Sequence, residues 1–118
     1  MSGIVGEGEV SDYKTIYRKA AAFGFQALGS QISSVVANYL SRKYGMTIAD
    51  TFSKPDSLGE ALEGTLGAGG LLIERRIVKS IYLQLSSPLS DSDIRLRTRQ
   101  DFERYVMESQ ALFQKIHG

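Results

Sequence analysis

The chain lacks cysteine altogether, and it holds a single histidine among its 118 residues. Without cysteine, disulfides, zinc–thiolate sites and cysteine nucleophiles are excluded. The lone His117 lies one residue from the end of the sequence, where chains fray, whereas a catalytic base must be held firmly. No apolar run reaches the roughly 18 residues that cross a bilayer. We therefore expect neither a catalytic histidine nor a membrane span.

The chain also has almost no net charge: it contains 14 basic and 13 acidic residues, and the net charge is +1. Such a chain has no long-range attraction to nucleic acid or to an anionic membrane, so that only a local basic patch could supply one. Its length and its 42% hydrophobic content are typical of one globular domain. We expect a single domain over residues 1–118, with residues 1–10 as a flexible lead-in. The absence of cysteine and of a signal peptide predicts a cytoplasmic protein.

Apolar residues recur at three- and four-residue steps from Tyr13 to Leu40. This spacing predicts one long amphipathic helix, or two helices that meet near Gly24. A helix of about 33 residues would extend about 50 Å, longer than a domain of this size is wide. It must kink near Gly24 or pack against another chain. Small residues four positions apart form a smooth stripe that another helix could approach, and the sequence therefore predicts a homodimer. The stripe consists of Gly29, Ser33 and Ala37.

The remaining helices are indicated by capping signals. Ser57 and Glu60 have the spacing of a capping box and predict a short helix over residues 58–66. Thr98 and Asp101 have the same spacing and predict a final helix from about Arg99 to Ile116. Residues 47–52 fit either a short strand or a turn of helix.

Two segments rich in isoleucine, valine and tyrosine favour β-strands. Residues 71–74 and 77–85 predict one long bent strand or two strands broken near Arg75. In residues 93–97 apolar and charged side chains alternate, which is typical of a half-buried strand, although a helix that begins at Ser90 is an alternative. We therefore predict an α+β fold: a long N-terminal helix, straight or kinked, a short helix, a small antiparallel sheet and a C-terminal helix.

Basic residues gather in the second half of the chain. If residues 77–85 pair with residues 93–97, several cations share one face of the sheet, and arginine guanidinium groups suit phosphate and carboxylate. A tyrosine among them could stack on a base. A solvated surface, a nucleic-acid interface and a site for a small anion all remain open. The candidate residues are Arg75, Arg76, Lys79, Arg95, Arg97, Arg99 and Tyr82.

Other candidate sites are weaker. The glycine-rich run Gly64–Gly70 resembles a phosphate loop, but it is expected to close a helix and open a strand, the reverse of the order that phosphate loops need. No spacing of aspartate and glutamate matches a known metal loop. We therefore predict no catalytic residues, no metal site and no cofactor, and an enzyme is the less favoured class.

Half of the chain resembles the ligand-binding superfamily that includes vinyl-reductase-type domains and the TRAPP trafficking subunits. The resemblance rests on Leu28, Gly29, Leu40, Leu58, Leu62, Gly70 and the segment through Leu85, Pro88 and Leu89. The cysteine- and glycine-rich segment of that superfamily is missing, so its lipid or haem pocket is not carried over. The sequence is also similar in texture to small archaeal proteins of unknown function.

Three functions follow as hypotheses. The first is a non-catalytic regulatory or assembly module that forms a homodimer. The second is a nucleic-acid-binding domain that uses the arginine-rich sheet face. The third is a domain that binds a small molecule or a lipid in a pocket between the long helix and the sheet.

Overall fold

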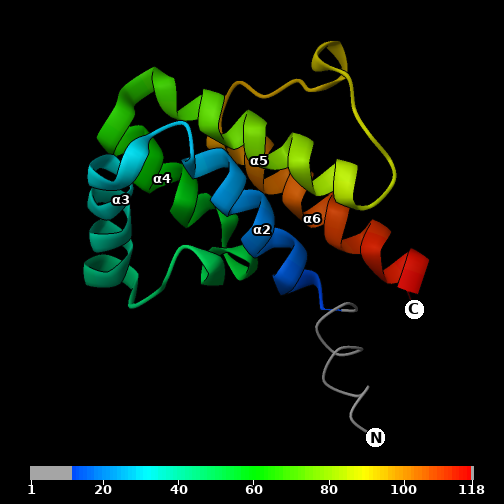
Figure 1. Ribbon diagram of the computed structural model, residues 1–118, viewed down its shortest axis with the longest axis horizontal. Helices are drawn as coiled ribbons and strands as arrows, with labels where there is room; N and C mark the ends of the chain where they lie inside the picture. Colours follow the sequence, from blue (N-terminus) through cyan, green and yellow to red (C-terminus); the bar gives the residue numbers. More distant parts are fainter. Residues whose placement is uncertain (1–11, 118) are drawn as a thin grey trace, which may run out of the picture.

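The computed structural model describes residues 12–117, and this part of the chain is helical, with no β-strand (Figure 1). Five α-helices and three short 3₁₀ turns follow one another in these residues. The expected lead-in over residues 1–10 lies outside the described residues. In chain order the elements are α2 (Tyr13–Phe25), α3 (Gly29–Tyr44), η1 (Ala49–Ser53), α4 (Pro55–Leu66), η2 (Gly67–Gly69), α5 (Gly70–Gln84), η3 (Asp91–Asp93) and α6 (Arg99–His117).

The prediction of an α+β fold is wrong, because residues 71–85, expected as strand, lie mostly in the single helix α5. The buried residues Ile73, Ile77, Val78 and Ile81 recur at steps of three and four, which places them on one side of a helix. Strand preference of isoleucine and valine mostly reflects how well they pack on a half-buried sheet, and it yields to this helical spacing. Arg75 and Lys79 lie on the outer side of α5.

Residues 93–97 are not a strand either, although their predicted alternation is present. Ile94 and Leu96 are buried, whereas Arg95 and Arg97 are exposed. In the described residues there is no neighbouring strand to pair with, so the segment is an extended connection. The alternative of a helix beginning at Ser90 is realised as one 3₁₀ turn, η3, around which Ser90 and Asp93 form a capping box.

The segment from Tyr13 to Leu40 forms two helices rather than one long helix, which was one of the two predictions. The break lies at residues 26–28 rather than at Gly24. Gly29 begins α3 with a φ of 80°, a conformation that favours glycine. The chain turns sharply there, so that α3 runs across the end of α2 (Figure 1). The argument for a dimer from a 50 Å helix is therefore lost. Residues 47–52 contain the helical turn η1 rather than a strand.

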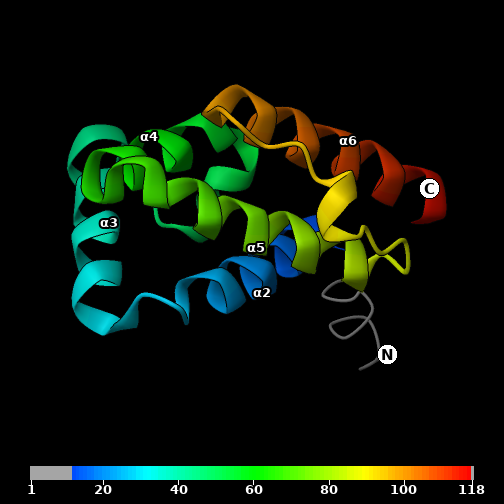
Figure 2. The same ribbon diagram turned by 90° about the horizontal axis from the view of Figure 1, so that it is seen from above.

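Helix α5 lies in the middle of the molecule, with α2 on one side and α4 and α6 on the other (Figure 2). Gly24 allows α2 to approach α5 closely, because a Cβ there would lie 2.7 Å from Cγ1 of Ile77. Gly70 does the same for α4 and α5, since a Cβ would lie 3.0 Å from the backbone of Leu62. The core between these helices is closely packed, and Phe102 of α6 is completely buried in it.

Helix α3 packs on the rest of the molecule through Val36 and Leu40, and Glu60 of α4 adds polar contacts to it. Lys43, Tyr39 and Tyr44 of α3 all donate hydrogen bonds to the carboxylate of Glu60. Arg99 of α6 approaches from the other side, with Nη1 3.8 Å from Oε1. Donation by Lys43, followed by the two tyrosines, lowers the pKa of Glu60 to about 2. None of the helices over residues 12–117 has the length and apolar character that crossing a bilayer requires.

Candidate ligand-binding site

A pocket of about 520 Å³ opens where the end of α4, the turn η2 and the beginnings of α5 and α6 meet. These four segments are brought together by the glycine-rich connection between α4 and α5. That connection was expected to open a strand, but it opens helix α5 after the 3₁₀ turn over residues 67–69. The first turn of α5 and the first turn of α6 therefore both border the pocket.

Glu74 lies in the wall of this pocket and is the most unusual side chain in the described residues. Only 2% of its surface is exposed, and no described residue hydrogen-bonds to its carboxyl group, in which Oε1 is fully buried. A buried polar atom without a partner costs about 1–3 kcal/mol, so native proteins retain few of them. Glu74 occupies a position that packing alone would give to an apolar residue.

The environment of Glu74 favours its neutral form. Desolvation by burial, assisted by the negative charges of Glu63 and Asp101, raises the pKa of Glu74 to about 8, against the opposing charge of Arg99. The carboxyl group is therefore mostly protonated at neutral pH. A protonated carboxyl is a hydrogen-bond donor as well as an acceptor. Buried titratable groups with strongly shifted pKa values are frequent at functional sites.

Gly59 of α4 makes room for this carboxyl. A Cβ at Gly59 would lie 3.1 Å from Oε2 of Glu74 and 2.5 Å from Cβ of Arg99. Only a residue without a side chain lets α4, α5 and the start of α6 approach this closely. The sequence therefore specifies the narrow space in which Glu74 is held.

Two arginines from the start of α6 border the same pocket. Arg99 lies between two glutamates of α4, with Nη1 3.8 Å from Glu60 and 3.7 Å from Glu63. Arg97 is exposed, and no carboxylate of the described residues lies within ion-pair distance of it. The predicted capping box is confirmed: Thr98 and Asp101 each bond the other's backbone, and Asp101 also accepts from the Arg97 N–H.

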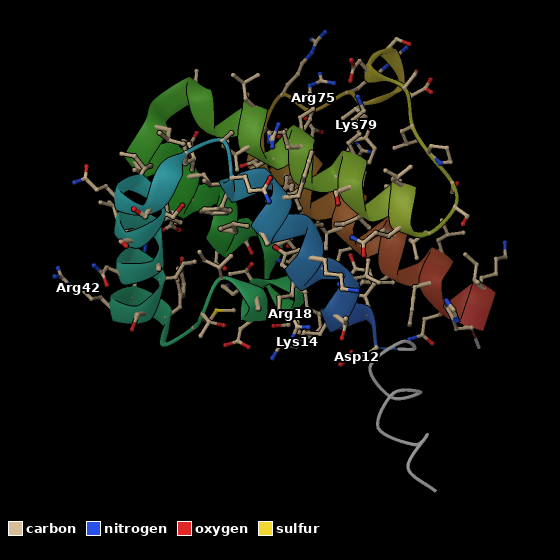
Figure 3. All side chains as sticks on the ribbon, viewed as in Figure 1. Asp12, Lys14, Arg18, Arg42, Arg75 and Lys79 are labelled. Atoms are coloured by element: carbon tan, nitrogen blue, oxygen red, sulfur yellow. The ribbon has the colours of Figure 1, made fainter. Side chains whose placement is uncertain are left out.

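The other predicted cations lie elsewhere, on the outer side of α5. Arg75 Nη1 donates to the backbone oxygen of Asp91 at 3.0 Å, and Lys79 Nζ lies 2.9 Å from the carboxylate of Asp91. Figure 3 shows both side chains at the edge of α5 that faces the connection carrying η3. Arg76 stacks on the ring of Phe23 and donates to its backbone oxygen. These cations hold neighbouring segments together.

The predicted cluster is thus divided into two groups, and its other members are dispersed. Tyr82 is buried and donates to the backbone oxygen of Tyr105 at 3.3 Å, so its ring is not available for stacking on a base. The side chain of Arg95 points to solvent. The sheet face that would have joined these residues does not exist in the described part of the chain.

The predicted dimer stripe lies along α3. Gly29 is exposed, and Ser33 and Ala37 are partly exposed. Helix α3 contributes only Val36 and Leu40 to the core. The three residues therefore remain accessible on the surface, on the helix that is least covered.

Sequence reasoning missed Glu74, although a signal for it was present. In helical register Glu74 falls between Ile73 and Ile77, inside the apolar stripe, and a lone acid there is a candidate functional residue. The strand interpretation hid this by placing Glu74 on the opposite face from both. Over residues 12–117 no three acidic or histidine side chains lie close enough to hold a metal ion.

Comparison with known proteins adds no assignment to this geometry. The resemblance to vinyl-reductase-type domains stays a prediction. No protein family, curated protein or solved structure was found to match the chain.

Proposed function

We propose that this protein binds a small molecule in the pocket between α4, α5 and α6. The observation that carries the proposal is the buried Glu74 carboxyl, which lines a pocket of about 520 Å³ and has no hydrogen-bond partner among the described residues. A ligand that hydrogen-bonded the other carboxyl oxygen, Oε2, would offset part of the cost of burying a carboxyl group without a partner. The lining is made largely of glycine and of polar or charged side chains, which suits a polar ligand. This pocket replaces the one expected between a long helix and a sheet.

The proposal is tested by screening a panel of small, chemically diverse fragments against ¹⁵N-labelled protein. We expect binders to shift the backbone amide resonances of Gly67, Gly70 and Arg97, and not that of Gly45 at the end of α3. The variant Ala68→Trp places a large side chain at the exposed rim of the pocket and should abolish these shifts. Ala27→Trp, at an exposed turn between α2 and α3, is the matched control and should leave them unchanged. A panel that shifts no pocket resonance in the wild type contradicts the proposal.

Self-association is a second candidate, which the accessibility of α3 favours. Val35 is 50% exposed, and the neighbouring small residues would let the same helix of a second copy approach. Sedimentation velocity at increasing concentration tests it: a dimer that is lost in Ala37→Glu supports an assembly module, and a monomer throughout contradicts it. The hypothesis of nucleic-acid binding required an arginine-rich sheet face, and the described residues form no sheet. We keep the cytoplasm as the proposed location, because the chain has no cysteine.

A further inference from the structure

We propose that the ligand carries a carboxylate, with one oxygen accepting a hydrogen bond from the carboxylic acid of Glu74 and its charge facing Arg97 and the first turn of α6. This inference rests on the proposed function and names the chemical class that the same pocket takes. Binding then includes a proton, which stays on Glu74 while the ligand is bound. No bond is made or broken.

The groups that face Glu74 keep its carboxyl group protonated, so that it donates a hydrogen bond rather than carrying a negative charge. Glu63 of α4 and Asp101 of α6 disfavour its ionised form by their negative charge, and Arg99 of α6 only partly opposes them. On the side of α2, Tyr17 is fully buried and keeps its proton, because burial raises its pKa. With a pKa of about 8, Glu74 enters a complex at pH 7 as a neutral acid. A hydrogen bond from a neutral acid to a carboxylate oxygen is charge-assisted, and such bonds are about twice as strong as neutral ones.

The rest of the pocket supplies positive potential for the negative charge. The N–H groups in the first turn of a helix have no partner within the helix, and the helix dipole places partial positive charge there. At the start of α6 the carboxylate of Asp101 accepts from the N–H groups of Arg97 and Thr98. The N–H groups of Arg99 and Gln100, two residues that line the pocket, have no partner among the described residues. The start of α5 adds no free N–H group at Gly70, because that N–H already bonds to the carbonyls of η2. Arg97 has no ion-pair partner among the described residues.

The balance of side-chain charges favours a single negative charge on the ligand. Among the side chains that line the pocket, Glu63 offsets one of the two arginines and Glu74 is neutral, which leaves one net positive charge. The carboxylate of Asp101, next to this lining, reduces that positive potential. A phosphate dianion would bring a second negative charge close to Glu63, and an ammonium group would face Arg97 and the positive end of α6. A carboxylate matches both the charge and the donor.

The test uses three probes of similar size, namely butyrate, butylamine and inorganic phosphate, titrated into ¹⁵N-labelled full-length protein at pH 7 and pH 9. We expect butyrate to shift the amides of Gly70, Arg97 and Gln100, with a dissociation constant about tenfold larger at pH 9, because the protonated fraction of an acid with a pKa of about 8 falls about tenfold between these pH values. Butylamine should leave these amides unshifted, and phosphate should bind more weakly than butyrate.

Variants separate the roles of the two acids. Glu74→Gln keeps a donor in place, so it should bind butyrate with an affinity that no longer depends on pH. Glu63→Gln removes a negative charge that helps raise the pKa of Glu74, so binding should still depend on pH but with the midpoint at lower pH. Arg97→Gln should weaken the binding of butyrate at both pH values.

Three results would overturn the inference. They are a butyrate affinity that does not fall from pH 7 to pH 9, preferential binding of phosphate or butylamine, and no shift of pocket amides by butyrate. If fragments of another class still shift the pocket amides, the proposed function stands and only the ligand class is wrong. If the fragment panel also fails, both are wrong.

Discussion

Replacing Glu74 by glutamine should change how the stability of the protein depends on pH. Glutamine has nearly the same shape as glutamate, but it is neutral at every pH. In the wild type the pKa of Glu74 is about 8 in the folded state, against 4.5 for an ordinary glutamate. A buried acid whose pKa is raised on folding stabilises the protein fully only below its unfolded pKa. Its contribution is lost as the pH rises from 4.5 to about 8.

The size of this effect follows from the two pKa values. Each unit of difference corresponds to about 1.4 kcal/mol, so the free energy of unfolding of the wild type should fall by about 5 kcal/mol between pH 4.5 and pH 8 because of Glu74 alone. Glu74→Gln should be about as stable as the wild type near pH 4.5 and several kcal/mol more stable at pH 9. This difference is large, because the total free energy of unfolding of an ordinary domain is about 5–15 kcal/mol.

Urea denaturation followed by circular dichroism, at one-unit steps from pH 4.5 to pH 9, measures this difference. Acids with lowered pKa values, such as Asp50 and Glu60 at about 2, titrate below this range and are common to both proteins. Glu108→Gln is the control, since it alters an exposed acid of α6 that does not contribute to the pKa shift of Glu74, and it should follow the wild-type curve. Parallel curves for wild type and Glu74→Gln would refute the reasoning, because they would show that Glu74 titrates alike in the folded and unfolded states.

Three further substitutions test the packing around the site. Gly59→Ala places a Cβ 2.5 Å from Cβ of Arg99 and should destabilise the protein by about 1–3 kcal/mol in urea, whereas Gly64→Ala in the same helix, with no atom within 4 Å of its Cβ, should not. Phe102→Ala removes a fully buried ring of α6 and should lower the free energy of unfolding by about 3–5 kcal/mol; a loss under 1 kcal/mol would contradict the placement of α6. Glu60→Gln removes the charge that Lys43 and two tyrosines share, so hydrogen exchange should quicken in α3 and not in α2; equal rates in α3 would show that other contacts hold it.

Most capping signals predicted helix ends in this chain correctly, whereas residue preferences assigned the wrong element types. The exception is the capping box expected at Ser57 and Glu60, because α4 begins at Pro55 and the Ser57 hydroxyl donates to the backbone oxygen of Lys54. The side chain of Asp12 accepts from the N–H of Lys14 at the start of α2, Gly45 ends α3 in the left-handed region, and Thr98 with Asp101 begins α6 as expected. These signals depend on local hydrogen bonds that the sequence displays directly. The strand assignment of residues 71–85 failed because isoleucine and valine are common in strands, while the spacing of the same residues is helical. Spacing deserves more weight than preference, since burial of a stripe determines which element forms.

The candidate site could be predicted only in part. Arg97 and Arg99 were singled out as cations, and both border the pocket. They lie apart from Arg75 and Lys79 because residues 70–84 form a helix, whereas a strand was predicted there from the sequence. Glu74 was missed for the same reason. The contribution of Gly59 depends on how closely α4 approaches α6, and packing between distant segments is not visible in local sequence.

The central claim is that Glu74 remains a neutral acid at physiological pH in a pocket that offers it no partner. It is tested most directly by a ¹³C NMR titration of the glutamate side-chain carboxyl carbons, with the Glu74 resonance assigned from its absence in Glu74→Gln. We predict a midpoint near pH 8, which should move higher when butyrate is added. A midpoint near pH 4.5 would contradict the account.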